Sequence, residues 1–338
     1  MRIGIPRETK PGELRVALFP DHAATLVLDG HEVRVASGAG GGIGHVDSSW
    51  LDAGAQIVAA PDAWDAELIV KVKEVQEADC AHLRAGQTLF CFHHLPGEPG
   101  RTRAVAASGI TAIAFEMVRD ASGGFPLLAP MSLIAGRMAI DVAARHLQRA
   151  PRDVLVLGSG KAGLAAAAEA LSRGARVTTL RRASATAEAV ERAALEADLV
   201  VGAVFVPGEP TPKLLPRSLV ARMKPGSMIV DISIDAGGVA ETSRPTTHAA
   251  PVFVEEGVIH YCVANMPAAE PARAAAAISA AVLPFARELA SKGIARAVRE
   301  NAALRSGVLV WKGRVTHEGI AKEAGLAYTA LSDRDLED

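Results

Sequence analysis

The sequence predicts an α/β protein made of two doubly wound domains. Short apolar segments that read as strands alternate with helix-like segments, and this alternation occurs twice along the chain. The chain has 338 residues, more than one ordinary hydrophobic core organises, so two domains are expected. A glycine turn that begins at Gly158, between an apolar strand and an alanine-rich helix, lies at the start of the second series.

The first third of the chain predicts βαβ units around a mostly parallel sheet. A helix-like segment is expected at 22–30, and apolar strands are expected at 2–5, 32–36, 55–59, 68–72, 88–92 and 111–118. Residues 131–149 carry apolar side chains at helical spacing and contain no proline. This pattern indicates a long helix that leads from one domain into the next.

The second series starts at Asp153 and indicates another doubly wound unit, over about residues 151–265. Its strands are expected at 154–158, 176–180, 199–204 and 227–234, and its helices at 162–172, 187–197 and near 217–223. The alanine-rich segment 268–290 reads as a further long helix. We expect the tail, residues 307–326, to fold back on the first domain.

Composition favours a compact soluble protein, since 49% of the residues are hydrophobic and the formal net charge is only −2. No basic stripe suggests nucleic acid, and neither an apolar signal segment nor an uninterrupted membrane-length run is found. The three cysteines have no paired spacing and the histidines form no metal-type cluster. We therefore predict no metal site, reduced thiols and a cytoplasmic location.

The glycines of the turn, Gly158, Gly160 and Gly163, fit the GxGxxG pattern of a dinucleotide site in a Rossmann-like fold. The first glycine permits a tight turn, the second lets the backbone approach a pyrophosphate, and the third lets the helix pack on the strand. Phosphate charge then lies at the helix N-terminus. The alternative is a strand-to-helix turn that needs small residues for packing alone. The pattern favours binding of NAD or NADP.

The residues after the next strand bear on the choice of dinucleotide. About twenty residues beyond the turn, an acid normally accepts the ribose hydroxyls of NAD, whereas an arginine receives the 2′-phosphate of NADP. This chain has Arg181 and Arg182 there. They favour NADP, and the alternative is a solvated basic loop.

Two basic positions in the first domain are candidates for binding a substrate. Arg15 lies beside turn residues and could take a carboxylate as a two-pronged pair, or be a surface charge. Strand alternation puts Lys71 and Lys73 on one face at the carboxyl end of strand 68–72, where α/β folds bind ligands. A partly desolvated lysine can hydrogen-bond a carbonyl or carbinolamine oxygen. The alternative is a pair of edge lysines with their charged ends in water.

Further candidates follow other strands. Strand 88–92 ends at His93 and His94, only one of which can face a ligand, and histidine suits proton transfer near neutral pH. Asp231 is placed inside strand 227–234 and is interpreted as structural, whereas Asp235 at its end is better placed for a ligand. Asn265 could serve a nicotinamide or only cap the following helix.

The chain resembles the alanine dehydrogenase family, which also includes the soluble nicotinamide domain of proton-translocating transhydrogenase. The resemblance runs in order over nearly the whole chain, in GIPRETKPGELRVAL, VKVKE, PLLAPMS, AGRMA, MKPGSMIVDISIDAGG, ETSRPTTH and HYCVANMPA. It implies that both chain ends, 1–128 and 300–338, build the substrate domain. It implies that 129–299 forms the dinucleotide-binding domain with its linking helices, and that the protein is a homo-oligomer, a dimer or a hexamer.

The resemblance also implies roles at matching positions. Arg15 would bind the carboxylate of a small amino or keto acid, and Lys73 would hydrogen-bond the substrate oxygen. His94 would donate and accept the proton. Asp235 would line the reaction centre, and Asn265 would lie near the nicotinamide.

The chain departs from the family pattern on the cofactor side. Ser132 would lie near the cofactor phosphates, but Leu133 stands where family members usually have a glutamate. The region after the glycine turn is shorter by one strand-helix unit, about twenty to thirty residues. Strand 176–180 is therefore either the second strand, with its acid replaced by Arg181, or the third strand after loss of the second. In the latter case Arg181 carries no information about NADP.

Three functions remain open from the sequence. The first is an NAD(P)-dependent amino acid dehydrogenase that interconverts L-alanine with pyruvate and ammonia. The second is an imine-reducing dehydrogenase of the opine or saccharopine type, which acts on a larger amine. The third is a protein that has lost the dinucleotide and performs non-redox chemistry on an amino or keto acid.

Overall fold

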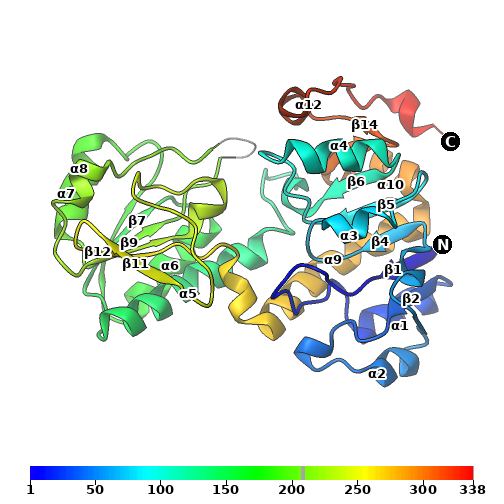
Figure 1. Ribbon diagram of the computed structural model, residues 1–338, viewed down its shortest axis with the longest axis horizontal. Coiled ribbons are helices and arrows are strands. Elements are labelled where there is room, and N and C mark those ends of the chain that lie inside the picture. The colour runs from blue at the N-terminus through cyan, green and yellow to red at the C-terminus, as the bar shows by residue number, and fades with distance from the viewer. Residues whose placement is uncertain (207–209, 338) are drawn as a thin grey trace. The chain divides into compact units, whose positions relative to one another are not determined.

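A computed structural model describes residues 1–206 and 210–337 and divides the chain into two compact α/β units. Unit 1 comprises Met1–Pro130 and Glu270–Asp338, and unit 2 comprises Met131–Ala269. Both chain ends therefore build unit 1, coloured blue to cyan and orange to red in Figure 1. The second boundary lies at 269/270 rather than at 299/300, because the long helix α9 (Pro271–Lys292) packs within unit 1.

Unit 1 is built on an eight-stranded sheet. Its strands are β1 (Arg2–Ile5), β2 (Glu32–Ala36), β3 (Gln56–Val58), β4 (Leu68–Val70), β5 (Thr88–Cys91), β6 (Thr111–Ala114), β13 (Val308–Trp311) and β14 (Arg314–Val315). They lie in the order β14-β13-β6-β5-β4-β1-β2-β3. Strands β1 to β6 pair in parallel, and β4, β5 and β6 are buried along their whole length, as expected of strands covered on both faces.

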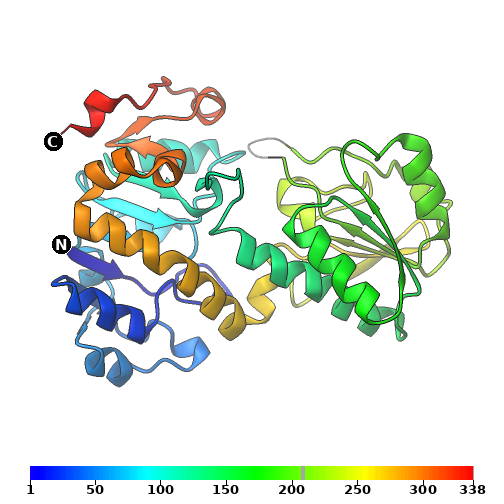
Figure 2. The ribbon, with the colours of Figure 1, turned by 180° about the vertical axis from the view of Figure 1, so that it is seen from behind.

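The helices of unit 1 cover this sheet. They are α1 (Pro20–Leu28), α2 (Asp47–Asp52), α3 (Glu77–Cys80), α4 (Pro99–Ala107), α9, α10 (Ile294–Glu300), α11 (Ala302–Ser306) and α12 (Glu318–Ala324), with short 3-10 turns at 41–43, 62–64, 115–117 and 333–336. Figure 2 shows α9 running across the sheet, where it contacts β4 and α1. Among the described helices, α9 alone is long and apolar enough to cross a membrane by length and composition. Eight of its side chains are buried in the unit, so we interpret it as a core helix.

The C-terminal tail joins the sheet of the N-terminal segment, which confirms the predicted fold-back. Strand β13 pairs antiparallel with β6, and β14 pairs antiparallel with β13. Leu309 and Val310 of β13 share a hydrophobic cluster with Ile110 and Ala112. Apolar burial over this shared cluster fixes the tail on the unit.

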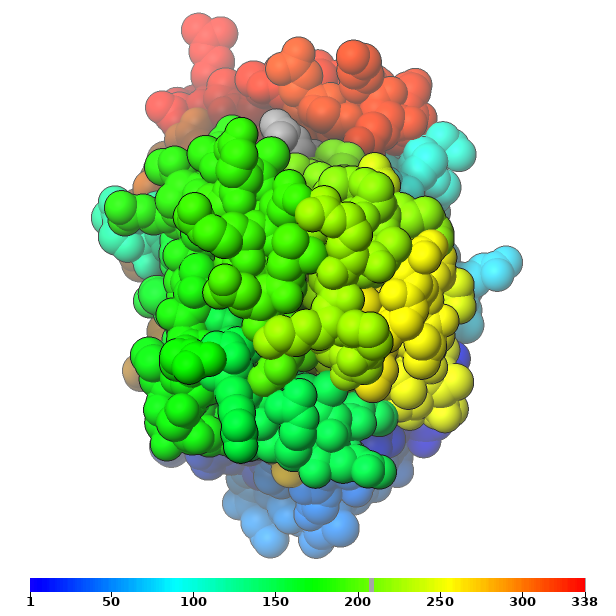
Figure 3. Space-filling view, turned by 90° about the vertical axis from the view of Figure 1, so that its left-hand side faces the viewer, coloured from blue at the N-terminus to red at the C-terminus, as the bar shows by residue number. Residues whose placement is uncertain are grey.

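Unit 2 is built on a six-stranded sheet. Its strands are β7 (Asp153–Leu157), β8 (Arg176–Leu180), β9 (Leu199–Gly202), β10 (Met228–Asp231), β11 (Val252–Glu255) and β12 (Val258–Tyr261), in the order β11-β12-β10-β9-β7-β8. The helices are α5 (Ala129–Leu147), α6 (Lys161–Ser172), α7 (Ala187–Glu196) and α8 (Arg217–Val220), with 3-10 turns at 232–236 and 266–269. Figure 3 shows one face of the unit, with green residues of its first half and yellow residues of β11 and β12 on opposite sides, as the strand order requires.

The strand order shows where β8, the strand after the glycine turn and α6, lies in the sheet of unit 2. Strand β8 follows α6 directly and pairs in parallel with β7, on the side of β7 opposite β9. In a doubly wound sheet this is the place of the second strand. In the described part of the chain the sheet ends at β8. Strand β8 therefore occupies the place of the second strand, and the next strand of the sheet along the chain is β9.

One predicted strand is shorter than expected. Strand β10 ends at Asp231, whereas the sequence predicts a strand over 227–234, and residues 232–236 form a 3-10 turn. The cause is local, because the Asp231 carboxylate accepts a hydrogen bond from the Ser233 N–H at 3.1 Å and bends the chain out of the sheet.

Candidate functional site

Lys73 and His94 lie together in unit 1. Lys73 Nζ is 3.5 Å from His94 Nε2. Both residues follow the carboxyl ends of neighbouring parallel strands, β4 and β5, which meet at one edge of the sheet. Lys73 is only 6% exposed. The structure thus brings a lysine and a histidine into contact in a largely buried setting.

Lys71 has a different environment from Lys73. Its side chain is fully buried, with Nζ 3.0 Å from Asp79 Oδ2 and 3.5 Å from Glu8 Oε2. The two lysines therefore have different partners, because only Lys73 lies beside His94. Backbone hydrogen bonds to the segment of β5 continue as far as Val72, beyond the end of β4 at Val70.

The two histidines also differ, and only His94 reaches Lys73. His93 is fully buried, with Nε2 3.1 Å from the Leu89 carbonyl oxygen. The backbone N–H groups of His93 and His94 donate to Glu116 Oε1, at 3.1 and 2.7 Å. His94 has a left-handed backbone with φ of 45°, which this buried carboxylate helps to hold. Sequence reasoning missed Glu116, whose signal was a single acid inside the apolar run 111–118.

Burial keeps these histidines neutral near pH 7. Burial and the nearby charge of Lys73 lower the pKa of His94 to about 3. Burial also raises the pKa of Glu116, although it accepts backbone hydrogen bonds. A neutral imidazole has one nitrogen that accepts a proton, as a general base requires.

The buried His93 makes stability depend on pH. Burial lowers its pKa from 6.5 to about 4, so the unfolded chain binds a proton below pH 6.5 that the folded protein excludes until about pH 4. The contribution is complete above pH 6.5 and falls by about 3 kcal/mol as the pH drops to 4. We expect His93→Gln to flatten the dependence of unfolding free energy on pH between 4 and 6.5, measured by urea unfolding. An unchanged slope would show that His93 titrates normally in the folded protein.

Arg15 is buried and paired. It is 2% exposed, and its Nε and Nη2 donate to the two carboxylate oxygens of Glu13, each at 2.6 Å. The Arg15 hydrogen bonds hold the pKa of Glu13 below its ordinary value although burial raises it. The reading of Arg15 as a surface charge is therefore excluded, and its guanidinium has a fixed orientation.

Three consecutive residues tie the segment that carries Arg15 to the segment that carries Lys73. Glu8 Oε1 accepts the Val72 N–H at 2.6 Å. Thr9 Oγ1 donates to Asp79 at 3.0 Å, and Lys10 Nζ donates to Glu74 Oε1 at 2.6 Å. We call Glu8, Thr9 and Lys10 the strap. It sets the position of the N-terminal loop relative to the loop after β4.

The glycine turn of unit 2 has the geometry that its pattern predicts. Gly158 has φ of 109°, and a Cβ there would lie 2.2 Å from the Ala203 carbonyl oxygen. A Cβ on Gly163 would lie 2.0 Å from the Gly158 carbonyl oxygen, so the helix packs closely on the turn. A Cβ on Gly160, the residue before α6, would meet nothing within 4 Å. The open space before the N-terminus of α6 fits a pyrophosphate.

Arg181 stands beside this turn. It follows β8 directly, and the Leu180 carbonyl oxygen accepts the Gly158 N–H at 2.9 Å. Arg181 and Arg182 are exposed, and neither makes an ion pair with any carboxylate in residues 1–206 and 210–337. The position after the second strand therefore carries a positive charge where an NAD site has an acid.

Asp231 and Asp235 separate as expected into a structural and an accessible carboxylate. Asp231 is fully buried and accepts the Val239 N–H at 2.8 Å and the Ser243 hydroxyl at 2.6 Å. Asp235 is exposed in the 3-10 turn after β10. Asp231 shapes the loop that presents Asp235.

The remaining predicted residues also lie in unit 2. Ser132 is half-buried in the first turn of α5, and Leu133 beside it is exposed. Asn265 is half-buried, with a left-handed φ of 57°, after β12. Asparagine tolerates this conformation better than most residues.

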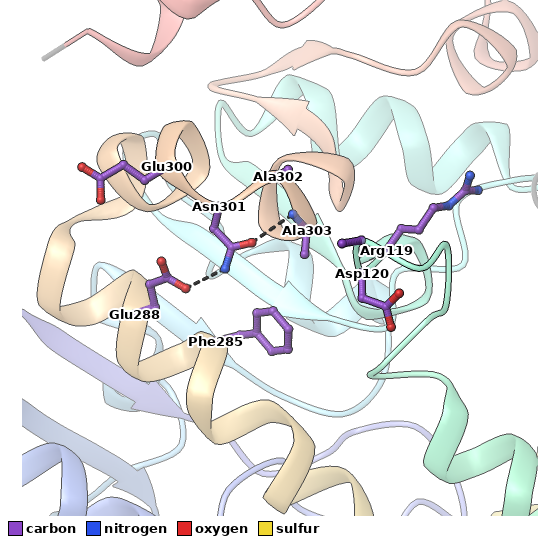
Figure 4. Close-up of a pocket in the computed structure, with 9 residues that line it drawn as sticks. Arg119, Asp120, Phe285, Glu288, Glu300, Asn301, Ala302 and Ala303 are labelled. Atoms are coloured by element: carbon purple, nitrogen blue, oxygen red, sulfur yellow. Dashed lines mark hydrogen bonds between the residues drawn. The ribbon is translucent and has the colours of Figure 1, made fainter.

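Unit 1 also has an open pocket that none of the predicted site residues lines (Figure 4). Its lining includes Arg119, Asp120, Phe285, Glu288 and Asn301. Asn301 donates to Glu288 Oε2 at 2.6 Å and accepts the N–H of the residue two positions on, which caps α11. These polar groups serve the fold, so the pocket is assigned no ligand.

Comparison with known proteins agrees with this arrangement. Residues 4–135 match the family model described as alanine dehydrogenase/PNT, N-terminal domain, and residues 179–318 match the model of the C-terminal domain. Alanine dehydrogenases from Halomonas elongata and Mycobacterium tuberculosis are 43% and 44% identical, each with 97% of this chain and 98% of the relative covered. A solved structure of an L-alanine dehydrogenase has a TM-score of 0.88 at 38% identity, covering 95% of this chain and 98% of that one.

The length of one alignment supports the shortening seen in unit 2. The match to the Halomonas elongata protein extends over 363 residues, 25 more than this chain contains, so that relative carries segments absent here. The identity and coverage nevertheless extend through both units. The chain therefore belongs to the alanine dehydrogenase/PNT family.

Proposed function

We propose that the protein is a nicotinamide-dependent amino acid dehydrogenase that interconverts L-alanine with pyruvate and ammonia. Relatives that bear the name alanine dehydrogenase match nearly its whole length. The observation that carries the proposal is the contact of Lys73 Nζ with His94 Nε2, in the unit that also buries Arg15. These are the groups needed to hold a carboxylate, polarise an oxygen and move a proton.

Within this proposal Arg15, Lys73 and His94 of unit 1 each have one role. Arg15 binds the substrate carboxylate and orients the α-carbon. The ammonium of L-alanine first releases one proton to solvent, and the α-carbon then loses its hydride to give an iminium. Water adds to this iminium and ammonia leaves, which forms the carbonyl of pyruvate. Lys73 hydrogen-bonds the developing oxygen. His94 Nε2, neutral because burial lowers its pKa, accepts the proton from the attacking water and returns it to the leaving nitrogen.

Unit 2 is proposed to bind the dinucleotide. Gly158, Gly160 and Gly163 would admit the pyrophosphate, and Ser132 would lie near the phosphates. Asn265 would lie near the nicotinamide, and Asp235 would line the reaction centre. When bound, the nicotinamide supplies the hydride acceptor in one direction and the hydride donor in the other. The open space at Gly160 supports this fit.

Turnover with defined substrates tests the proposal. The purified protein is expected to reduce NAD⁺ or NADP⁺ with L-alanine and to oxidise the reduced form with pyruvate and ammonium, followed at the nicotinamide absorbance. Activity with pyruvate and ornithine or lysine, but none with ammonium, would instead identify an imine-reducing enzyme of larger amines. Failure to bind either reduced dinucleotide in calorimetry would leave cofactor-free chemistry as the function.

We further propose that NADP is preferred, because Arg181 takes the place of the ribose-binding acid at the end of the second strand. The protein is expected to bind NADPH at least tenfold more tightly than NADH in calorimetric titration. Arg181→Asp should reverse this order, since the carboxylate repels the 2′-phosphate and accepts a ribose hydroxyl. Arg192→Asp, which changes the same charge at an exposed position on α7, is the matched control. Equal binding of both dinucleotides by the unaltered protein would contradict the assignment.

We also propose a cytoplasmic homo-oligomer, a dimer or a hexamer. The burial of α9 in the core of unit 1 supports a protein outside the membrane. The assembly is proposed from the family resemblance. Light scattering after size-exclusion chromatography would give the number of subunits directly.

A further inference from the structure

Next to Lys73 the structure buries a carboxylate oxygen with no hydrogen-bond partner. Glu74 is 3% exposed, and its Oε1 accepts the Lys10 ammonium at 2.6 Å. Its other oxygen, Oε2, is buried and has no partner among the described residues. Building on the proposed function, we propose that Glu74 Oε2 accepts a hydrogen bond from the amino nitrogen of the substrate.

An unpartnered buried carboxylate oxygen needs a donor. Leaving such an atom without one costs free energy, because water no longer solvates it. The ion pair with Lys10 satisfies only one of the two oxygens. A purely structural carboxylate would have donors within the chain for both of its oxygens. The second oxygen of Glu74 is therefore available to a donor on a bound ligand.

The charge of Glu74 determines the chemistry of that group. Burial raises its pKa, but His94, Lys10 and Lys73 together outweigh this effect and lower it to about 2. The side chain is therefore an anion at neutral pH, which attracts a cationic N–H and repels a carboxylate. L-Alanine and the iminium derived from it both present a positively charged nitrogen. Pyruvate and 2-hydroxy acids present none.

The position of Glu74 fits a role beside Lys73 and Arg15. It follows Lys73 in sequence, and Lys73 Nζ lies 3.5 Å from His94 Nε2, so Glu74 stands next to this pair. Lys10 of the strap holds its Oε1, and the strap belongs to the same loop as Arg15. A substrate whose carboxylate is bound by Arg15 and whose reacting oxygen is bound by Lys73 needs a third contact for its nitrogen. Glu74 supplies that contact and selects amino acids over hydroxy acids.

Glu74→Gln tests this assignment, because glutamine keeps the shape but removes the charge and puts either a donor or a weaker acceptor at Oε2. With the preferred dinucleotide, we expect KM for L-alanine and for ammonium to rise at least tenfold. KM for pyruvate should change less than twofold, since pyruvate carries no amino nitrogen. Glu77→Gln removes the same charge at an exposed position three residues on, and it should leave all three KM values unchanged.

A purely structural role would give a different pattern. If Glu74→Gln raises KM for pyruvate and ammonium equally, the residue only orders the site and the assignment fails. If Glu74→Gln does not fold, as judged by thermal melting, Glu74→Asp retracts the oxygen but keeps the charge, and a selective rise for ammonium is again expected. Unchanged KM for ammonium in the folded variant overturns the inference alone. Absence of amino acid oxidation by the unaltered protein overturns the proposed function itself, and this inference with it.

Discussion

Lys73→Met is expected to lower kcat/KM for L-alanine oxidation by about 10²–10³-fold, the usual loss when one donor to a developing oxygen is removed. Methionine keeps the length of the side chain and its packing against Phe92, whose ring centroid lies 5.9 Å from Lys73 Nζ. What it removes is the amine beside His94. Initial rates from nicotinamide absorbance, over a range of alanine concentrations, measure the effect.

A surface lysine provides the control for this experiment. Lys322 is exposed on α12, so Lys322→Met makes the same chemical change away from the site and should leave kcat/KM within twofold of normal. Near-normal turnover of Lys73→Met would mean that the amine does not contact the substrate. The proposed role of the contact between Lys73 and His94 would then be abandoned.

Lys71→Met should instead act on stability, with a loss of about 3–5 kcal/mol in the free energy of unfolding. The change leaves Asp79 and Glu8 buried without the ammonium that lies 3.0 and 3.5 Å from their oxygens. The partners of Lys71 are Glu8 and Asp79, and burial raises the pKa of Glu8 despite Lys71. The same pair raises the pKa of Lys71 although burial opposes it.

Denaturant unfolding followed by tryptophan fluorescence measures this loss, since all three tryptophans of the chain belong to unit 1. Adding Asp79→Asn to Lys71→Met removes one buried carboxylate that the first substitution leaves without its ammonium partner. The double variant is therefore expected to regain part of the lost stability. Lys73→Met, two residues away, should destabilise the unit less than Lys71→Met. Equal effects of the two substitutions would refute the distinction between a structural and a functional lysine.

The contrast between these lysines shows where sequence reasoning stops. Both are part of the apolar segment at 68–72 or follow it, and period-two alternation assigns them to one face. The strand ends before either of them, and the difference arises from partners that are close in space. Glu8 is 63 residues from Lys71 in the sequence, and no local sequence pattern predicts that pair. Glu74 and Glu116 were missed for the same reason.

The sequence by itself determined the features that depend on neighbouring residues. Alternation of strands and helices predicts two parallel α/β units, and the glycine spacing predicts the turn before α6, because backbone conformation and periodicity are local properties. The placement of Lys73 and His94 after strands also follows from the sequence, since the carboxyl ends of parallel strands share one edge.

The tertiary structure decided everything that depends on strand order and on distant partners. It placed β8 beside β7, in the place of a second strand, and Arg181 follows the end of β8. It paired β13 with β6, which is nearly two hundred residues away in the sequence. It also buried Arg15 in an ion pair with Glu13, whereas a surface arginine would be solvated by water. It also left Glu74 Oε2 without a hydrogen-bond partner in the described part of the chain. The physical reason is that strand order and ion pairing are set by the burial and desolvation of the whole unit, which no single segment encodes.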